Sequence, residues 1–467
     1  MNSIVKDPGS FRDPGSQVYS DREHVLRAVY PSSAVDYEAF RDSGLLDQLI
    51  LEERLVPSEE VNAAANPGGQ AAAYMLRHPR LPFISYAYEW PLGLLRKAAL
   101  FHIDILLTAL DRGFTLSDAT AYNVQFVGTK PIFIDHLSFR PYREGEIWAA
   151  HRQFCMQFLN PIVLWSRFGI APNAWFRGSL EGIEPEQLAP LLRWRDRLSP
   201  TMLSHIILQG MFQQRANSGK TRDIPAHETK LSRESFKVML SGLRSFIDRA
   251  RMPQRRSAWD EYASDNSYSG AEAEAKHRFV RRMAASVKPG VVIDLGCNTG
   301  DYSIAALEAG AGQAIGFDFD FGALEQAVTR ADTNNLHFLP LWLDATNPSP
   351  DQGWAQKERK GFTERVRGDA VLALAFIHHL AIARNVPLPM VVDWVMSIAP
   401  VGVIEFPPKT DPMVQLLLRN RADIFPDYGQ DQFLACIERR ARIIDQEQLS
   451  PGGRLLVWYD ADKHAGR

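Results

Sequence analysis

In the second half of the chain, short apolar runs alternate with stretches that carry apolar residues at helical spacing. This alternation is typical of βαβ units and a parallel sheet. We expect strands at 291–295, 314–317, 337–341, 370–375 and 401–406. Two further runs, 441–445 and 454–459, are joined by Ser450-Pro451-Gly452-Gly453. A linker of this kind favours an antiparallel hairpin, so we expect an antiparallel strand at the edge of the sheet.

The first half of the chain has a different pattern. From Leu92 to Leu110, apolar residues recur at helical spacing, and Gly113 follows where a helix is expected to end. A polar stretch at 213–234 is followed by a second helical pattern, which Pro253 ends. With 467 residues and 45% hydrophobic content, the chain is too long for one core, since single cores stop growing at roughly 250–300 residues. We predict two domains, 1–252 and 253–467, the first with a small lobe of about 1–90 and a helical lobe of about 91–252.

Composition narrows the possible partners. A net charge of −3 gives no global attraction for nucleic acid or for anionic membranes, and the basic stretch 249–256 is best explained as a solvated linker. The three cysteines, Cys155, Cys297 and Cys436, lie far apart and show no metal-ligand spacing, which favours a reduced, intracellular chain. The N-terminus lacks the apolar core of a secretory signal, and no run approaches the roughly 20 apolar residues of a membrane span. We therefore predict a cytoplasmic protein without a membrane span or a nucleic-acid partner, and its oligomeric state stays open.

The clearest chemical signal is the segment 291–300, Val-Val-Ile-Asp-Leu-Gly-Cys-Asn-Thr-Gly, in which a buried strand runs into a turn with two glycines. Gly296 and Gly300 lack a Cβ, so we expect them to let a ligand approach the backbone. Asp294 precedes the glycines, and the spacing matches neither Gly-x-Gly-x-x-Gly nor a phosphate loop ending in Gly-Lys-Ser/Thr. The segment therefore favours a site for an ammonium group and a sugar over a pyrophosphate site.

Carboxylates also follow the next two predicted strands. Asp318 comes about twenty residues after the loop, where a carboxylate can accept both ribose hydroxyl hydrogens, and Asp320 is a less favoured substitute. Asp344 follows the third strand and could accept a hydrogen bond from an adenine amino group. Taken alone, a residue like Asp344 is more often a turn or N-cap residue. The recurrence of a carboxylate after three successive strands predicts a single nucleoside site.

The order Asp294-x-Gly296-x-Asn298-x-Gly300, then Asp318, then Asp344, resembles class I S-adenosylmethionine-dependent methyltransferases, and 259–459 looks like one complete domain of that family. More narrowly, 374–380 (LAFIHHL) and 404–414 (IEFPPKTDPMV) are similar to nodulation-protein-type methyltransferases of bacteria. The resemblance implies a doubly wound, Rossmann-like α/β sheet with S-adenosylmethionine as methyl donor. It also implies donor binding by Asp294, Gly296, Asn298, Gly300, Asp318 and Asp344. Asn298 stands where the middle glycine is usual, which narrows the conformational freedom of the loop.

The acceptor side carries weaker signals. Methyl transfer is an in-line displacement, so the protein mainly aligns the reactants and supplies a base only if the acceptor must lose a proton. His378 and His379, after the fourth strand, are the candidate catalytic residues; alternatively, one caps the next helix and the other packs. Glu405 and Lys409 are more readily explained as a surface salt bridge than as acceptor ligands. A segment before the sheet resembles a lid over the donor, with plain packing as the alternative: Trp259, Tyr262, Asn266, Tyr268, Lys276 and His277.

In the first half, Asp118-x-x-x-x-Asn123 followed by Asp135 has the separations of a kinase catalytic loop and its metal-binding Asp. The region resembles a protein-kinase-like or aminoglycoside-kinase-like α+β domain, with 83–90 in place of the interlobe hinge. The resemblance implies that Asp118 orients an acceptor hydroxyl, while Asn123 and Asp135 hold Mg²⁺ for ATP. The flanking residues depart from the kinase pattern, and no glycine-rich loop or strand lysine is evident, with Arg27 as a weak substitute. Asx turns explain these residues equally well, so a degenerate nucleotide-binding or docking module is favoured.

Three hypotheses follow. The first is an S-adenosylmethionine-dependent methyltransferase that acts on a small-molecule, glycan or natural-product acceptor. The second is a bifunctional kinase and methyltransferase, in which the first domain carries out ATP-dependent phosphotransfer. The third is a scaffold without activity, which the intact donor-site residues argue against.

Overall fold

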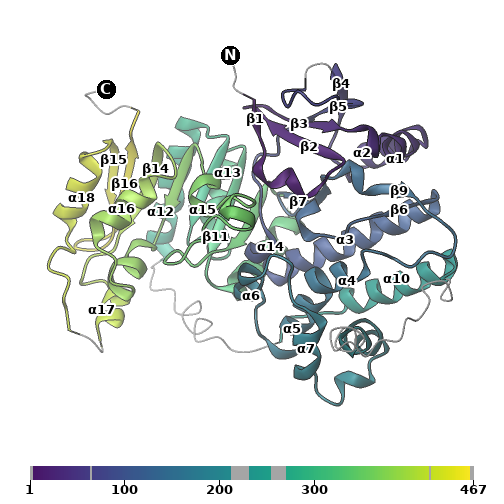
Figure 1. The fold of residues 1–467 in the computed structure, drawn as a ribbon. Helices are drawn as coiled ribbons and strands as arrows, with labels where there is room; N and C mark the ends of the chain where they lie inside the picture. Colours follow the sequence, from purple (N-terminus) through teal and green to yellow (C-terminus); the bar gives the residue numbers. More distant parts are fainter. Residues whose placement is uncertain (1–3, 64–65, 212–230, 254–269, 420–421, 463–467) are drawn as a thin grey trace. The chain divides into compact units, whose positions relative to one another are not determined.

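The structure, a computed structural model, describes residues 4–63, 66–211, 231–253, 270–419 and 422–462 (Figure 1). The chain divides into two compact units. Unit 1 comprises 1–126, 131–255 and 351–359, and unit 2 comprises 127–130, 256–350 and 360–467. Four residues of the predicted lid (Trp259, Tyr262, Asn266 and Tyr268) and the end of the basic stretch lie outside the described residues.

Unit 1 opens with a five-stranded sheet in the order β1-β2-β3-β5-β4, in which each neighbouring pair is antiparallel. Two helices connect β3 to β4, and Tyr37 and Phe40 of the first are buried. This sheet and the helices after it give unit 1 the α+β composition that the sequence predicts. The elements are β1 (Val5–Lys6), η1 (Pro8–Arg12), β2 (Ser16–Ser20), β3 (His24–Val29), α1 (Pro31–Asp42), α2 (Leu45–Leu51), β4 (Glu59–Val61) and β5 (Tyr74–Pro79).

The rest of unit 1 is mainly helical. The predicted helix is confirmed as α3 (Leu92–Asp111), which ends where Gly113 takes a φ of +79°. It packs along α10 (Arg233–Asp248), and Arg244 Nε lies 2.6 Å from Asp104 Oδ1. The other elements are η3 (Ala87–Glu89), β6 (Phe114–Leu116), η4 (Ala121–Asn123), β7 (Val124–Val127), β8 (Lys130–Phe133), η5 (His136–Ser138), β9 (Phe139–Pro141), α4 (His151–Phe154), η6 (Cys155–Leu159), α5 (Asn160–Phe168), α6 (Asn173–Gly178), α7 (Pro185–Leu188), η7 (Ala189–Leu191), η8 (Asp196–Leu198), α8 (Pro200–Met202) and η9 (Leu203–Ile207).

Unit 2 contains a seven-stranded sheet in the order β12-β11-β10-β13-β14-β16-β15. The first five strands in this order are parallel, β16 pairs antiparallel with β14, and β15 and β16 form the predicted edge hairpin. The strands are β10 (Val291–Leu295), β11 (Gln313–Asp318), β12 (Phe338–Trp342), β13 (Ala370–Ala373), β14 (Val401–Phe406), β15 (Arg442–Gln448) and β16 (Leu455–Asp460). The strand at β13 was expected to reach residue 375. It ends earlier because Ala375 takes a left-handed conformation with a φ of +49°.

Helices cover the sheet of unit 2 on both faces, as a doubly wound fold requires (Figure 1). Residues of α12 and α13 form one core with alternate residues of the central strands, among them Val292, Leu372 and Val403. On the opposite face of the sheet, α16 packs against α18 and β13. The helices are α12 (Gly270–Val287), α13 (Asp301–Glu308), α14 (Phe321–Thr333), η10 (Trp354–Gln356, in the 351–359 segment of unit 1), α15 (Phe362–Arg365), η11 (His379–Ala383), α16 (Leu388–Met396), α17 (Pro412–Leu418) and α18 (Gln430–Glu438).

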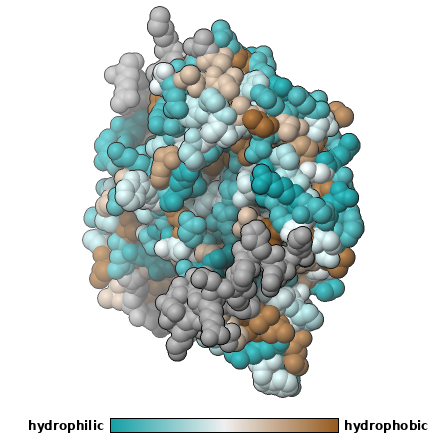
Figure 2. All heavy atoms as spheres, turned by 45° about the vertical axis from the view of Figure 1, so that its right-hand side comes forward, coloured by the Kyte–Doolittle hydropathy of each residue, from teal (hydrophilic) through white to brown (hydrophobic). Residues whose placement is uncertain are grey.

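On the face drawn in Figure 2, hydrophobic residues lie singly or in small groups among hydrophilic ones. Scattered apolar residues of this kind are normal on protein surfaces. Among the residues that the structure describes, no helix combines the length and the apolar character needed to cross a bilayer.

Candidate active site

The order of the strands identifies one edge of the unit 2 sheet as the place for a ligand. Strand β10 pairs with β11 on one side and with β13 on the other, so the strand order reverses between β10 and β13. In open α/β sheets, ligands bind outside the carboxyl ends of the strands at such a reversal. The chain leaves the sheet at this point through the donor loop, 296–300, and through 374–376.

The donor loop has a left-handed backbone at three positions, with φ of +75° at Gly296, +49° at Asn298 and +90° at Gly300. A Cβ on Gly300 would clash with the ring of Phe338, and one on Gly296 would lie 3.2 Å from Phe376 Cδ2. The glycines are therefore required by backbone conformation and by neighbouring rings. That they also let a ligand approach the backbone stays a prediction. Asparagine tolerates the left-handed region better than most residues, which explains how Asn298 replaces a glycine.

Asp318, at the end of β11, is tied to the donor loop. Its Oδ2 accepts a hydrogen bond of 2.8 Å from the backbone N–H of Asn298, and its Oδ1 accepts one of 2.8 Å from that of Asp320. Burial raises the pKa of Asp318. A carboxylate has about four acceptor positions, so both oxygens keep room for further donors such as hydroxyl groups. Asp320 instead caps α14, where its Oδ1 accepts from Gly322 and Ala323.

The other two predicted carboxylates differ in environment. Asp294 is only 1% exposed, and its Oδ2 accepts a hydrogen bond of 2.6 Å from Ser303 Oγ on α13. Burial raises the pKa of Asp294 to about 7. Asp344 forms a turn in which its Oδ1 accepts from Thr346 N at 3.0 Å and from Thr346 Oγ1 at 2.6 Å. This is the turn geometry that a residue in such a loop most often adopts, and the adenine contact stays a prediction.

His378 and His379 follow β13 and lie with their ring centroids 4.1 Å apart. His378 is buried, its ring does not cap the following helical turn, and neither ring nitrogen has a hydrogen-bond partner among the described residues. Burial lowers the pKa of His379 to about 4 and that of His378 well below its usual value. Both imidazoles are therefore neutral near pH 7, the form in which a ring nitrogen can accept a proton.

A buried network of charges lies at the same edge of the sheet and escaped the sequence analysis. Glu405, fully buried at the end of β14, lies 2.8 Å from Lys276 Nζ and 3.2 Å from Arg454 Nη1. Arg454 also makes a two-pronged contact with Asp411, at 2.6 and 3.1 Å. The expected surface pair between Glu405 and Lys409 is therefore wrong, since Lys409 pairs with Asp423. One signal in the sequence indicated this network. Glu405 is an acid inside the apolar run VGVIEF (401–406), and a charged residue buried in such a strand needs a buried partner.

This network reaches the residues that follow β13. Glu405 Oε2 accepts a hydrogen bond of 2.7 Å from the N–H of Ala375, which holds the left-handed backbone at that position. Burial lowers the pKa of Lys276 to about 8, despite the attraction of Glu405. The positive charges of Arg454 and Lys276 add to the effect of burial in lowering the pKa of His378. The charged network and the two histidines therefore belong to one region of unit 2.

In unit 1, the structure brings together the three residues of the kinase-like motif. Asn123 Nδ2 lies 3.3 Å from both Asp118 Oδ2 and Asp135 Oδ2. Arg27, on β3, pairs with Asp135 Oδ1 at 2.5 Å. Arg27 is the residue that the sequence offers as a weak substitute for the missing strand lysine. Asp118 and Asp135 also accept backbone hydrogen bonds two residues ahead, as Asx turns do. The same geometry is therefore compatible with both explanations of the motif, a kinase-like catalytic loop and a pair of Asx turns.

The carboxylate of Asp135 is fully engaged by protein donors. Oδ1 accepts from Arg27 and from the N–H of Leu137, and Oδ2 accepts from Asn123 and from Ser138 Oγ. Four donors fill the acceptor positions that a carboxylate offers. The residues as arranged do not fit Mg²⁺, which would have to displace one of these donors.

Comparison with known proteins decides the family. Residues 280–351, which hold the donor loop, Asp318 and Asp344, match the family model for ribosomal protein L11 methyltransferase (PrmA). Across 453 residues the chain is 44% identical to nodulation protein NoeA of Rhizobium meliloti (strain 1021), covering 96% of this chain and 94% of the relative. The chain belongs to the NoeA family. Its unit 2 is a class I S-adenosylmethionine-dependent methyltransferase domain, as the sequence motifs indicated.

Several solved structures show a more distant likeness to this NoeA-family chain. N-methyltransferase NodS from Bradyrhizobium japonicum WM9 is 12% identical, with a TM-score of 0.30 over 42% of this chain and 98% of NodS. The bifunctional kinase-methyltransferase WbdD is 17% identical, with a TM-score of 0.28 over 44% of this chain and 41% of WbdD. The assignment rests on the NoeA relationship, the family model and the strand order, and not on these low scores.

Proposed function

We propose that this NoeA-family protein transfers a methyl group from S-adenosylmethionine to a small-molecule, glycan or natural-product acceptor at the carboxyl edge of the unit 2 sheet. The observation that carries the proposal is the convergence of Asp294, Asp318 and the donor loop at the reversal of strand order. In the functional division that we propose, the methyltransferase domain begins at about residue 253.

The side chains at this edge fit the donor. Segment 294–300 contains an acid and no basic residue, which suits a cationic nucleoside better than a phosphate. When bound, S-adenosylmethionine supplies an electrophilic methyl group on a sulfonium centre. In our proposal, Asp318 accepts hydrogen bonds from the ribose hydroxyls and Asp344 accepts one from the adenine amino group. Asp294 pairs with the ammonium group. Gly296, Asn298 and Gly300 shape the backbone against which the donor lies.

On the acceptor side, we propose that His379 takes the acceptor proton, with His378 packed behind it. Because the pKa of His379 is about 4, its ring is already unprotonated throughout the neutral range. We therefore expect the rate of methyl transfer to be flat between pH 6 and pH 8 with respect to this group and to fall only as the pH approaches 4. An activity that falls between pH 7 and pH 6, and loses that dependence in His379→Gln, would contradict the proposed environment of His379.

The function itself is tested by incubating the purified full chain with S-adenosylmethionine labelled in the methyl group and a host-cell metabolite extract. We expect label in a defined small molecule or glycan, and far less of it at limiting donor when Asp318→Ala replaces the wild type. Label that appears only on protein or nucleic acid would overturn the proposed acceptor class. Absence of transfer, together with absence of donor binding, would overturn the methyltransferase function.

Proton release provides an independent test of Asp294. Its pKa of about 7 means that the carboxyl group is mostly protonated at pH 6, and an ammonium group nearby favours ionisation. Donor binding at pH 6 should therefore release part of a proton, which calorimetry in two buffers of different ionisation enthalpy measures directly. The release should vanish in Asp294→Asn. It should also vanish at pH 9, where the wild-type group is ionised before binding.

A second function, phosphotransfer in unit 1, is favoured by the convergence of Asp118, Asn123 and Asp135. The fully engaged carboxylate of Asp135 opposes it, so we propose that unit 1 serves instead to bind the acceptor or a nucleotide. We accordingly expect no Mg²⁺-dependent ATP hydrolysis by the purified protein. Turnover that is present in the wild type and lost in Asp118→Ala would reverse this choice and establish a bifunctional enzyme.

A further inference from the structure

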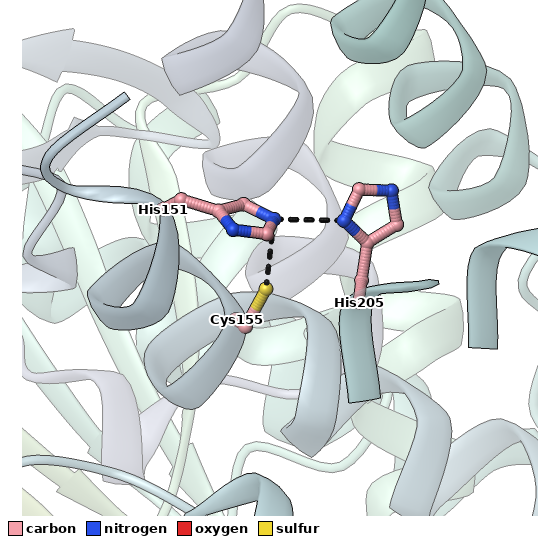
Figure 3. Close-up of side chains that lie close together, drawn as sticks. All are labelled: His151, Cys155 and His205. Atoms are coloured by element: carbon pink, nitrogen blue, oxygen red, sulfur yellow. Dashed lines mark hydrogen bonds between the residues drawn. The ribbon is translucent and has the colours of Figure 1, made fainter. Parts of the chain in front are cut away.

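The helical part of unit 1 contains a group of three side chains of the types that bind metals, two of them buried and His151 half-buried (Figure 3). His151 lies on α4, Cys155 follows one turn later, and His205 comes from η9. Their donor atoms all lie within 4.8 Å of one another. His151 Nε2 is 2.7 Å from His205 Nδ1 and 3.6 Å from Cys155 Sγ, so the His151 ring faces both partners in Figure 3.

The local backbone explains how these residues meet. His151 and Cys155 are four residues apart, which places them on one face of a helix. Cys155 begins the π-helical turn η6 and His205 lies inside a second π-helical turn, η9. A π-helical turn inserts one extra residue into a helix and is rare, well under 1% of residues, yet it is frequent at functional sites. Two of the three donors therefore lie in backbone that ordinary helix packing does not require.

The donor set suits a zinc-class cation. Two imidazoles and one thiolate are typical protein ligands of zinc. Burial lowers the pKa of His151 to about 3 and that of His205 to about 4, so both rings are in the neutral form that binds metals. Burial raises the pKa of Cys155, but an ion bound at sulfur removes the thiol proton.

The distances can be compared with those of a tetrahedral site. Ligands at ordinary zinc distances lie about 3.6 Å apart for a sulfur and nitrogen pair and about 3.3 Å apart for two nitrogens. The observed 3.6 Å between Cys155 and His151 matches the first value. The 2.7 Å between the two histidines is shorter, so the His205 ring must withdraw by about half an ångström to admit the ion.

A fourth residue is placed to orient His151. The side-chain amide of Gln209 lies 2.6 Å from His151 Nδ1, while Gln209 Oε1 has no hydrogen-bond partner among the described residues. Turning the amide over lets Oε1 accept from the Nδ1–H of His151, which leaves Nε2 as the nitrogen with a free lone pair. Metal-binding histidines are usually fixed in this way through their second nitrogen.

We propose that His151, Cys155 and His205 bind one zinc-class divalent cation, with Gln209 fixing the orientation of His151. The role of the ion is structural and concerns the Asp118 loop. The helical segment that carries His151 and Cys155 also carries Gln153 and Gln157. Gln153 Oε1 accepts from the N–H of Ala119 at 2.8 Å, and Gln157 Oε1 accepts from that of Ala121 at 2.8 Å.

Such an ion joins this segment to His205, 54 residues further along the chain. It thereby fixes the surface on which the loop with Asp118 rests. The inference concerns unit 1 and does not depend on methyl transfer in unit 2.

The test uses the full chain, stripped with a chelator and then titrated with Zn²⁺. We expect about one bound ion per chain by elemental analysis and a rise in the thermal unfolding midpoint. With Co²⁺ in place of Zn²⁺, we expect the near-ultraviolet charge-transfer band of a cobalt-bound thiolate. This band should disappear in Cys155→Ser. It should persist in the matched control Cys436→Ser, which changes a buried cysteine of unit 2.

Wild-type protein that binds neither ion, or that binds Co²⁺ without a thiolate band, would overturn the proposal and leave a plain hydrogen bond between the two histidines. A band that survives Cys155→Ser, or that Cys436→Ser removes, would overturn the assignment of the ligands. If Cys155→Ser does not fold, the wild-type cobalt spectrum and the effect of the chelator on the unfolding midpoint decide the question by themselves.

Discussion

Replacement of Asp318 by alanine is expected to weaken S-adenosylmethionine binding by about 100-fold or more. A hydrogen bond to a charged group contributes about 1.5–3 kcal/mol, and two ribose hydroxyls share this carboxylate in our proposal. A loss of about 3 kcal/mol corresponds to roughly two powers of ten in the dissociation constant. The substitution also releases the N–H of Asn298 from its hydrogen bond, so the left-handed donor loop loses a support. Isothermal titration calorimetry on the full chain measures the effect.

The matched control for this experiment is Asp320→Asn. Asp320 lies two residues further on and caps α14 through its side-chain oxygen, a role that asparagine also fills. We expect this variant to bind the donor within a few-fold of the wild type. If Asp320→Asn loses binding and Asp318→Ala retains it, the ribose contact belongs to Asp320. If both variants bind the donor like the wild type, the proposed nucleoside site is wrong.

The sheet of unit 2 could be predicted from the sequence because its parallel strands are buried on both faces and form continuous apolar runs. The expected strands agree with the observed ones within a few residues. The run expected at 370–375 ends early, at Ala373, because Ala375 turns into the left-handed region and its N–H donates a hydrogen bond to Glu405. Nothing local marks that turn, since alanine has no preference for the left-handed region and its partner lies 30 residues away.

The site residues could be named from local patterns, but their environments could not. Asp294, Asp318 and Asp344 are recognisable because each lies in the last residues of an apolar strand or directly after one. Whether one is buried beside a serine and another closes a turn depends on packing between distant segments. The same limit applies to Asp135, whose engagement by Arg27 joins residues 108 positions apart. The ligand group at His151 was missed for this reason, since His205 supplies the third donor from a different helical segment.

Neutralising Glu405 is expected to destabilise unit 2 strongly. Lys276 and Glu405 are 1% and 0% exposed, so Glu405→Gln leaves a buried ammonium group without its counter-charge. Removal of one partner from a buried ion pair generally lowers the free energy of unfolding by about 3–5 kcal/mol. The loss should be larger at pH 7 than at pH 9. In the wild type, the pKa of folded Lys276 is about 8, below that of a lysine in the unfolded chain, so stability rises with pH above about 8. Without Glu405 this pKa falls further, so the rise begins at a lower pH in the variant and narrows the loss between pH 7 and pH 9.

Urea unfolding of the full chain, with the transition of unit 2 assigned from hydrogen exchange of its peptides, measures this loss. Two variants serve as controls. Adding Lys276→Met to Glu405→Gln should recover part of the stability, because it removes the unpaired charge while Arg454 keeps its contact with Asp411. Lys409→Ala should leave the transition almost unchanged, because Lys409 pairs with Asp423 near the surface. A loss in Lys409→Ala as large as that in Glu405→Gln would restore the surface pair that the sequence alone suggested.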